Sequence, residues 1–543
     1  MPSAVRPNKG ESAAGLKAAS ILTVTATPPS PDGSHRRVSP LASLVLRAAP
    51  FLWASLLVLV PISSFPPLAE IAGGTGSVVA PLAAVPALLL LGLWVFPKWL
   101  KGDRLPPSSG PLFAFVGIAV LASAGSVFLD LHPFLGQAVF GRSVRALATL
   151  AVGLTFYFTS ATYPTTEGKL RSSMRWLAVG AVVMLLWSTV QATLSTGDAQ
   201  IPWQLRDFHR LFSVRDLISG RVTGFAYEPS WLADQLVVLY LPLWLGAVLA
   251  GFSAFRKIRG RFPVEALLLG WGLLILILSK SRIGILSALA VAAILGVVAI
   301  WRLGRHLRLP HGRGRIAGLG RGRTFSLGVR LVLLVVLVGL LVGGVYLLGM
   351  VDPRLGRLFT VRPVLAAGGW GAVYYYANQL AYAERVMYWA TGLKTFGLHP
   401  LLGVGLGNSG FLFRQSLPVY GYFLPEMIAI LNGAPGFPNP KNLWVRLLAE
   451  TGVVGFLLFT IWLARIGLAA HRLSRGQASV LRVIGAAGLI ALATQVIEGF
   501  SLDSFALPQL WIMLGLVTAG ASISSVSSPR ADGKSDSVPF RST

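Results

Sequence analysis

Long apolar runs recur along almost the whole chain, and each is close to the length that crosses a lipid bilayer. An α-helix needs about 20 predominantly apolar residues to cross a hydrocarbon core of about 30 Å. The sequence therefore predicts an all-α, polytopic membrane protein with about 12 transmembrane helices. The runs fall at 47–63, 77–96, 111–129, 144–162, 174–194, 231–253, 264–279, 282–300, 331–350, 443–464, 483–499 and 505–524.

Composition supports a membrane protein over a set of soluble domains. Hydrophobic residues make up 54% of the 543 residues and charged residues only 12%. The formal net charge of +27 would suggest nucleic acid as the partner of a soluble protein, but most basic residues lie in short connections between apolar runs. Chain orientation and anionic lipid headgroups explain that placement better, so we expect membrane lipids and no nucleic acid as partners. Because cysteine is absent, disulfides and thiolate metal sites are excluded.

Basic residues are concentrated in alternate connections, which sets the predicted topology. By the positive-inside rule both termini are cytoplasmic. The connections that are rich in basic residues hold Lys98, Lys101 and Arg104; Lys169, Arg171 and Arg175; Arg256 to Arg261; the arginines from Arg302 to Arg330; and Arg465 to Arg482. We expect a disordered tail at 1–40, spans 1–9 within 41–350, a large extracytoplasmic loop at 351–442, spans 10–12 within 443–525 and a cytoplasmic tail at 526–543. The stretch 302–323 is predicted to be an irregular cytoplasmic loop.

Four connections fall on the predicted outer side, where they can meet on one face: 196–230, Ser279–Arg282, 351–442 and 498–504. The largest of them, 351–442, is rich in cations. It carries Arg354, Arg357, Arg362, Arg385, Lys394, Arg414 and Lys441 against Asp352, Glu384 and Glu426. Long translocated domains tolerate such charge, but the excess favours an anionic ligand. A site on this face has no access to cytoplasmic nucleotide sugars. Any activated group that such a site uses is therefore expected to be carried on a lipid.

Short motifs surround this loop in a distinctive order. They are Leu-Ser-Lys-Ser-Arg at 278–282, Glu-Arg-Val-Met-Tyr-Trp at 384–389, a turn with glycines at 403, 405 and 407, and Lys-Asn at 441–442 followed by Leu-Ala-Glu-Thr-Gly-Val-Val-Gly at 448–455. Over residues 221–465 this pattern resembles the O-antigen ligase and O-antigen polymerase superfamily. In that family the large external loop also lies between the ninth and tenth spans.

The resemblance implies a glycosyltransferase of the bacterial inner membrane. Such an enzyme moves a glycan from a polyprenyl-diphosphate carrier to a hydroxyl of a glycan, lipid or protein acceptor. A diphosphate leaving group needs fixed cations, and arginine suits phosphate geometry. No Asp-x-Asp pair lies in the outer regions, so arginines are the expected ligands, and neither a metal nor a cofactor is expected.

The predicted diphosphate ligands are Arg282, Arg385, Arg221 and Asn442, and each arginine has an alternative interpretation. Arg282 interrupts a long apolar run, where an ionisable residue usually marks function, or else it extends toward the interface from a span end. Arg385 is a ligand or forms a surface pair with Glu384. Arg221 is a ligand or an interface anchor.

A base is needed to deprotonate the acceptor hydroxyl. The family commonly has histidine before the asparagine at the loop exit, whereas this chain has Lys441. Lys441 binds phosphate, or acts as the base if its pKa is strongly depressed. The other candidate bases are His399, Glu228 and Glu384, and His399 alternatively caps the glycine-rich turn.

Two further motifs have structural interpretations. Glu450 is expected to hold helix packing through a contact such as Arg446, four residues earlier. The glycines at 403, 405 and 407 do not follow a strand, so they are interpreted as permitting a tight re-entry of the loop toward the membrane.

The competing function is a transporter or flippase of lipid-linked glycans. A transporter is expected to place charges deep within many spans and to show internal repeats. Here the cations gather at one face and no repeat is evident, which favours the enzyme. A cell-wall glycan polymerase would share the chemistry, but the motifs fit the O-antigen group better.

Overall fold

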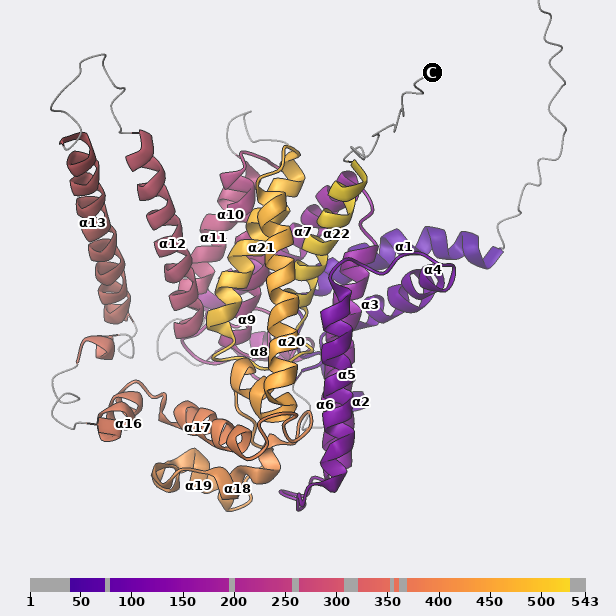
Figure 1. Ribbon diagram of the computed structural model, residues 1–543, viewed down its shortest axis with the longest axis vertical. Coiled ribbons are helices and arrows are strands. Elements are labelled where there is room, and N and C mark those ends of the chain that lie inside the picture. The colour runs from indigo at the N-terminus through magenta and orange to yellow at the C-terminus, as the bar shows by residue number, and fades with distance from the viewer. Residues whose placement is uncertain are drawn as a thin grey trace, which may run out of the picture. The chain divides into compact units, whose positions relative to one another are not determined.

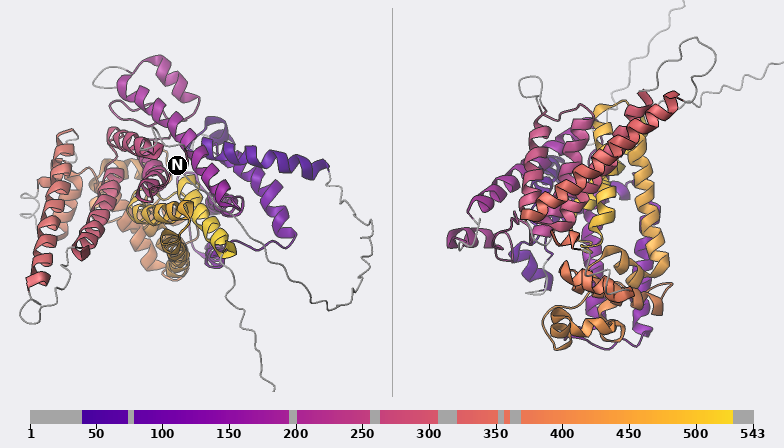
Figure 2. Two further views of the ribbon diagram at one scale, coloured as in Figure 1. Left: turned by 90° about the horizontal axis from the view of Figure 1, so that it is seen from above. Right: turned by 90° about the vertical axis from the view of Figure 1, so that its left-hand side faces the viewer.

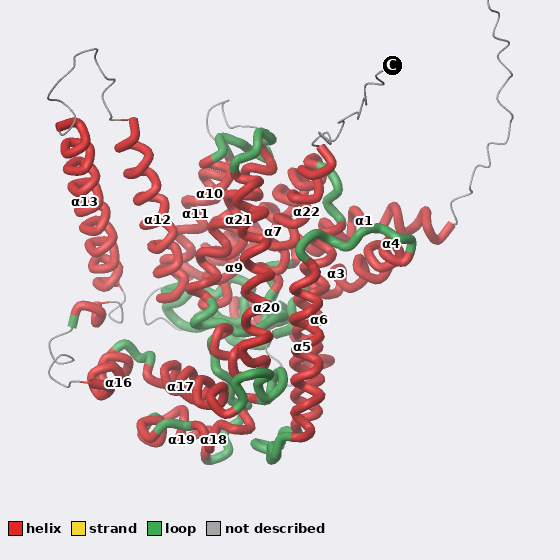
Figure 3. The backbone as a smooth tube through the Cα atoms, in the orientation of Figure 1, coloured by secondary structure: helices red, strands yellow, loops and turns green. Residues whose placement is uncertain are grey.

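The computed structural model describes residues 40–73, 79–194, 201–255, 263–306, 321–351, 356–360 and 369–527. Every regular element within these ranges is a helix (Figure 3), and the β-contacts found there are isolated bridges such as Ser64 with Ala80. The chain divides into two units, Met1–Leu44 and Val45–Thr543, and the helices that form the candidate site all belong to the second. The predicted tail at 1–40 lies almost wholly outside the described residues, as do 307–320 and 528–543.

Nine helices in the described ranges are long and apolar enough to cross a membrane. They comprise α5 (Ser109–Gly125), α6 (Val139–Thr162), α7 (Glu167–Leu194), α9 (Pro229–Gln235) continuing into α10 (Leu241–Leu249), α12 (Arg282–His306), α13 (Arg321–Val351), α20 (Leu443–Ser474), α21 (Ser479–Glu498) and α22 (Pro508–Ser527). Three shorter apolar helices are Val45–Leu59 within α1 (Pro40–Leu59), Ala84–Leu100 and α11 (Val264–Leu278). All twelve predicted runs overlap one of these helices. The all-helical membrane prediction is confirmed, while a total of twelve crossings stays a prediction.

Two of the apolar helices contain a π-helical segment. The segment Leu91–Val95 lies between α3 (Ala84–Leu90) and α4 (Phe96–Leu100), and the segment Leu236–Tyr240 joins α9 to α10. Each is followed closely by a proline, Pro97 or Pro242. Because proline has no N–H to donate to the preceding turn, a local widening of the helix accommodates it.

Close helix contacts in the core depend on small residues. Gly153 of α6 lies against the carbonyl oxygen of Phe505 and the indole of Trp511, and Gly515 of α22 lies against Ser160 of α6. A Cβ at Gly153 would come within 2.4 Å of the Phe505 oxygen, so the glycine is required for this approach. In lipid, where helix association depends on packing, small residues at helix crossings are a common solution.

The helices differ strongly in burial. In the span Pro229–Leu249, 83% of the most apolar stretch is buried, whereas in Val329–Met350 none is. The second of these belongs to α13, which packs against α12 at the edge of the bundle (Figure 2), where Gly296 lies close to Leu337. The span Pro229–Leu249 therefore lies in the core of the bundle, and the apolar stretch of α13 is left largely uncovered by the rest of the described chain.

The described part of 351–442 forms short helices beyond one end of α20–α22 (Figure 1). They are α16 (Gly369–Gln379), α17 (Ala383–Leu398), α18 (Phe413–Ser416) and α19 (Pro425–Leu431). Their own small core contains Met387, Tyr388, Phe413, Leu417, Met427 and Ile430. The ends of the arginine-rich stretch 302–323, predicted to be irregular, are helical as parts of α12 and α13.

Candidate functional site

The glycine-rich turn re-enters the bundle where α20 is kinked. Gly452 interrupts α20 with φ 65° and ψ −173°, which frees backbone carbonyls one turn earlier. Val404 N donates to Ala449 O at 3.0 Å, and Gly405 N donates to Glu450 O at 3.0 Å. A Cβ on Gly452 would lie 2.1 Å from Leu401 O. The predicted re-entry is therefore present, and it depends on a kink in the helix that the turn contacts.

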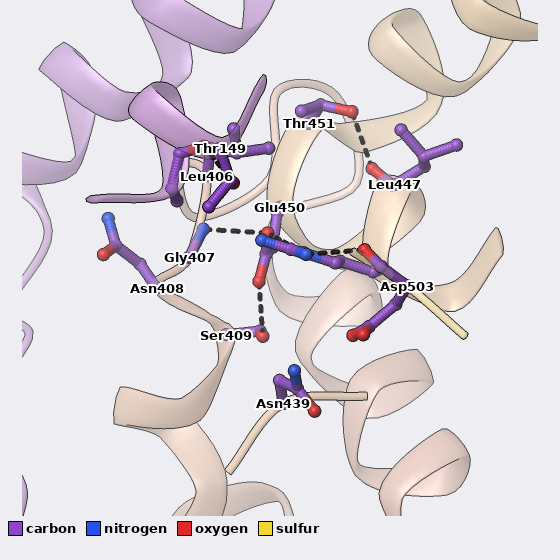
Figure 4. Close-up of polar contacts among 12 residues, drawn as sticks. Thr149, Leu406, Gly407, Asn408, Ser409, Asn439, Leu447, Glu450, Thr451 and Asp503 are labelled. Atoms are coloured by element: carbon purple, nitrogen blue, oxygen red, sulfur yellow. Dashed lines mark hydrogen bonds and ion pairs between the residues drawn. The ribbon is translucent and has the colours of Figure 1, made fainter. Parts of the chain in front are cut away.

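Glu450 fastens this turn to the helix through a buried network. Its Oε2 accepts from Gly407 N and from Arg446 Nε, both at 2.8 Å, and its Oε1 accepts from Ser409 Oγ at 2.9 Å. Arg446 also donates to Asp503 O at 2.7 Å. Figure 4 shows Glu450 between the Gly407–Ser409 turn and Asp503. The predicted Arg446–Glu450 contact is confirmed, and both side chains are at least 90% buried.

Arg282 and Arg385 meet on a single aromatic ring. The guanidinium of Arg282, at the start of α12, lies 4.9 Å from the ring centre of Tyr382, and that of Arg385, in the first turn of α17, lies 5.8 Å from it. Arg282 also donates to Leu380 O and Ala381 O, and Arg385 donates to Ser501 O at 2.9 Å. Two predicted ligands from distant parts of the sequence therefore lie together. The alternative interpretation of Arg385, an ion pair with Glu384, is not found among the described residues.

Arg221 supports the turn that precedes Arg282. Its Nε donates to Ser279 O at 3.1 Å and its Nη2 to Lys280 O at 3.3 Å. These carbonyls belong to the turn between α11 and α12, which confirms the tight hairpin expected from the 264–300 run. Hydrogen bonds thus join the predicted outer connections to one another at one end of the bundle. Arg221 donates to Ser279 O, Arg282 to Ala381 O and Arg385 to Ser501 O.

Left-handed backbone conformations gather at the same place. The non-glycine residues with positive φ in the described part of the chain are Ser108, Leu135, Lys280, Ala381 and Lys441. Lys280 lies two residues before the start of α12, Ala381 lies two residues before the start of α17, and Lys441 directly precedes the Asn442 cap of α20. Such conformations cost about 1–3 kcal/mol each and persist where surrounding contacts enforce them, often at functional sites.

Lys441 belongs to a compact group with Glu426 and Tyr388. Its ammonium lies 2.6 Å from Glu426 Oε1 and 4.2 Å from the centre of the Tyr388 ring, and the Tyr388 hydroxyl donates to Glu426 at 2.8 Å. Burial would raise the pKa of Glu426, but the hydrogen bonds and charge of Lys441 and the Tyr388 hydroxyl outweigh it and lower that pKa. The Lys441 side chain is thus held by Glu426 and by the Tyr388 ring, at the end of the loop that leads into α20.

Asn442 serves as the N-cap of α20. Its Oδ1 accepts from Trp444 N at 2.9 Å and from Val445 N at 3.1 Å, which satisfies two N–H groups of the first turn. The side chain is fully buried, and its Nδ2 has no hydrogen-bond partner in the described structure. The geometry therefore assigns Asn442 a structural role, with only the amide N–H₂ left for a ligand.

Asp503 is a functional candidate that sequence reasoning missed. It lies in the connection between α21 and α22, and its Oδ2 is buried without a hydrogen-bond partner among the described residues. Burial raises its pKa, while the nearby cations Arg446, Lys441 and Arg385 act to lower it. A carboxylate among these cations, with one oxygen that has no hydrogen-bond partner among the described residues, can accept a proton. The one sequence feature that points to Asp503 is its position in 498–504, one of the four predicted outer connections.

Of the remaining predicted bases, only Glu384 lies beside Tyr382 in the sequence. His399 follows the end of α17, and the helical rise places it roughly 20 Å from Arg385 at the other end. Glu228 directly precedes α9, pairs with Arg215 at 2.8 Å and accepts from Ser230 Oγ. Glu384 neighbours Arg385 in the first turn of α17 and is half-buried.

Comparison with known proteins identifies one family. A family model described as O-antigen ligase matches residues 267–460. The match includes Arg282, Arg385, the glycine-rich turn and the Lys441–Glu450 segment, and it ends before Asp503. No curated protein matches the chain.

Proposed function

Residues 267–460 belong to the O-antigen ligase family, and from this premise we propose that the protein transfers or polymerises a glycan carried on a polyprenyl diphosphate. The acceptor is a hydroxyl of a second glycan, a lipid or a protein. We place the protein in the bacterial inner membrane, with both termini cytoplasmic and the reacting groups on the extracytoplasmic side. The convergence of Arg282 and Arg385 on Tyr382 is the observation that carries this proposal.

The two arginines supply positive charge where the donor needs it. As the bond from the anomeric carbon to the diphosphate breaks, negative charge grows on the phosphate oxygens. Fixed cations that are already in place stabilise that charge without reorganisation. Arg282 and Arg385 bind the diphosphate, Lys441 adds a third charge, and Arg221 positions Arg282 through the Ser279–Lys280 turn. These side chains can do so without a metal ion.

Asp503 completes the reaction as the proton acceptor. The acceptor hydroxyl loses its proton to the Asp503 carboxylate, and its oxygen forms a bond to the anomeric carbon. The electron pair of the old carbon–oxygen bond leaves with the carrier diphosphate. The raised pKa of Asp503 and its unpartnered Oδ2 support this role. Glu384 is the second candidate, because it adjoins Arg385.

Reconstitution with a polyprenyl-diphosphate oligosaccharide and a glycan acceptor tests the proposal. Arg282→Ala is expected to lower transfer about 10²–10³-fold, the usual cost of removing one donor that stabilises developing charge. Arg414→Ala is the matched control, because Arg414 lies in the same loop with an exposed side chain. Protein abundance and thermal stability are measured for both variants.

Two results would overturn the proposal. One is movement of the carrier across the bilayer without a new glycosidic bond, which would identify a flippase. The other is equal transfer by the Arg282→Ala and Arg414→Ala variants at equal abundance.

A further inference from the structure

Two lysines lie against one tryptophan at the end of the bundle opposite the candidate site. Lys98 Nζ is 4.7 Å from the ring centre of Trp94, and Lys169 Nζ is 5.9 Å from it. Lys169 is also 4.7 Å from the ring centre of Tyr163. Gly407 of the candidate site packs on Arg142 at the start of α6, whereas Tyr163 directly follows its end. The 24-residue helix α6 separates the two places by about 35 Å.

The charge of this lysine pair is incompletely balanced. Asp103 lies 3.9 Å from Lys98, with 56% of its own side chain exposed. No carboxylate in the described part of the chain lies within ion-pair distance of Lys169. The aromatic rings attract both ammonium groups, but each such contact contributes only about 0.5–1 kcal/mol at an exposed position. The two ammonium groups beside this ring therefore carry excess positive charge that a bound anion can neutralise.

The surroundings of the pair are those of a lipid-facing surface. On the helix that carries Trp94 and Lys98, Leu93 is 45%, Phe96 53% and Leu100 73% exposed. The side chain of Trp53 stacks on Tyr163 at 5.1 Å between ring centres and extends the aromatic group into the bundle. Tryptophan and tyrosine beside lysine, next to exposed apolar side chains, are typical of the boundary between hydrocarbon and headgroups.

We propose that Lys98 and Lys169 bind the phosphate of an anionic phospholipid, with Trp94 and Tyr163 beneath the headgroup. The acyl chains lie along the exposed face of Leu93, Phe96 and Leu100. A membrane lipid fits better than a free phosphate ion because the lysines adjoin this apolar face. The predicted topology puts this site in the cytoplasmic leaflet. The site is independent of glycosyl transfer.

Native mass spectrometry and thermal unfolding of the full chain test the site. The probes are phosphatidylglycerol, phosphatidylcholine and inorganic phosphate, each added to detergent-solubilised protein. A basic side chain near a membrane surface contributes about 1 kcal/mol to anionic lipid binding, so Lys98→Gln with Lys169→Gln is expected to weaken phosphatidylglycerol binding roughly 30-fold. Lys101→Gln is the matched control, because Lys101 is exposed nearby and makes no ring contact.

The wild type and the Lys101→Gln variant should be stabilised by phosphatidylglycerol and not by phosphatidylcholine, and the double variant should lose that stabilisation. If the double variant unfolds, the single variant Lys98→Gln replaces it in the test, and its phosphatidylglycerol binding is expected to be roughly fivefold weaker than that of the wild type. Equal lipid retention by the lysine variants and the control would overturn the proposal. Equal stabilisation by inorganic phosphate would also overturn it, because the site would then take a free ion.

Discussion

Asp503 lies near the cations Arg446, Lys441 and Arg385, and its Oδ2 has no hydrogen-bond partner among the described residues. This combination yields a prediction about rate and pH. Asp503→Asn keeps the shape of the side chain but cannot accept a proton, so transfer is expected to fall about 10²–10⁴-fold with donor binding retained. Because only the ionised carboxylate is a base, the wild-type rate should fall as the pH drops through the raised pKa of Asp503.

Steady-state rates between pH 5 and pH 9 in the reconstituted system check both parts of this prediction. Asp103→Asn is the control, since Asp103 is an exposed aspartate at the opposite end of the bundle. An Asp503→Asn variant that keeps more than a tenth of the wild-type rate would show that another group takes the proton.

His209 allows a separate prediction about stability. Its side chain in α8 (Trp203–Arg210) is fully buried, and burial lowers its pKa to about 4, with the charge of Asp216 opposing that shift. The His209 imidazole therefore binds a proton more readily in the unfolded chain than in the folded one. The free energy of unfolding should decline as the pH falls below about 6.5, and the decline of about 3 kcal/mol is complete below pH 4.

Melting temperatures at several pH values between 7.5 and 4.5 test the His209 prediction. The His209→Leu variant should lose less stability than the wild type over this interval. The control is His471→Leu, which replaces an exposed histidine near the end of α20 and should follow the wild-type curve. Parallel curves for all three proteins would refute the prediction.

Single residues were predictable where they broke a pattern. Arg282 interrupts an apolar run, and Arg385 stands out by its charge, so the sequence alone is enough to propose both as ligands, and the structure brings both to the Tyr382 ring. The sequence does not single out Asp503 and Glu426, because the role proposed for Asp503 and the ion pair of Glu426 both depend on tertiary contacts. Arg385 and Ser501, which fasten the Asp503 connection to α17, are 116 residues apart in the sequence.

Among the elements, α20 owes its shape to Gly452. Gly452→Ala places a Cβ 2.1 Å from Leu401 O and forces a side chain to adopt φ 65°. We expect a loss of more than 1 kcal/mol in stability and a matching loss of transfer activity, because the glycine-rich turn would separate from the helix. Gly397→Ala, in α17 with open space around it, should leave stability unchanged or higher. Thermal unfolding of both variants provides the measurement.

The positions of helices could be predicted from the sequence better than their interruptions. Apolar length alone located α12 and α22, because a bilayer requires about 20 apolar residues. The kink at Gly452 and the π-helical segment before Pro242 depend on how neighbouring chains pack, and hydropathy does not report packing. The same limit applies to α20, which extends to Ser474, ten residues beyond the predicted end of its run.

At the scale of the molecule, the proposed function requires the 351–442 loop and the α20–α21 connection to lie on opposite sides of the membrane. The natural chain has no cysteine, so single introduced thiols can be labelled without background. Gln415 in the loop and Gln477 after α20 are both exposed glutamines and form a matched pair. In right-side-out vesicles, an impermeant maleimide should label Gln415→Cys and leave Gln477→Cys unlabelled.

Inside-out vesicles should give the reverse pattern, and detergent should allow both sites to react. The expectation follows from Arg465, Arg472, Arg475 and Arg482, which surround the end of α20, since the positive-inside rule holds short basic connections in the cytoplasm. Labelling of Gln415→Cys only from the inside would put Arg282, Arg385 and Asp503 in the cytoplasm. Nucleotide sugars would then become accessible donors, and a lipid-linked donor would lose its topological support. The transfer assay with Arg282→Ala would remain interpretable in that case, so the side of the reaction and its chemistry are tested independently.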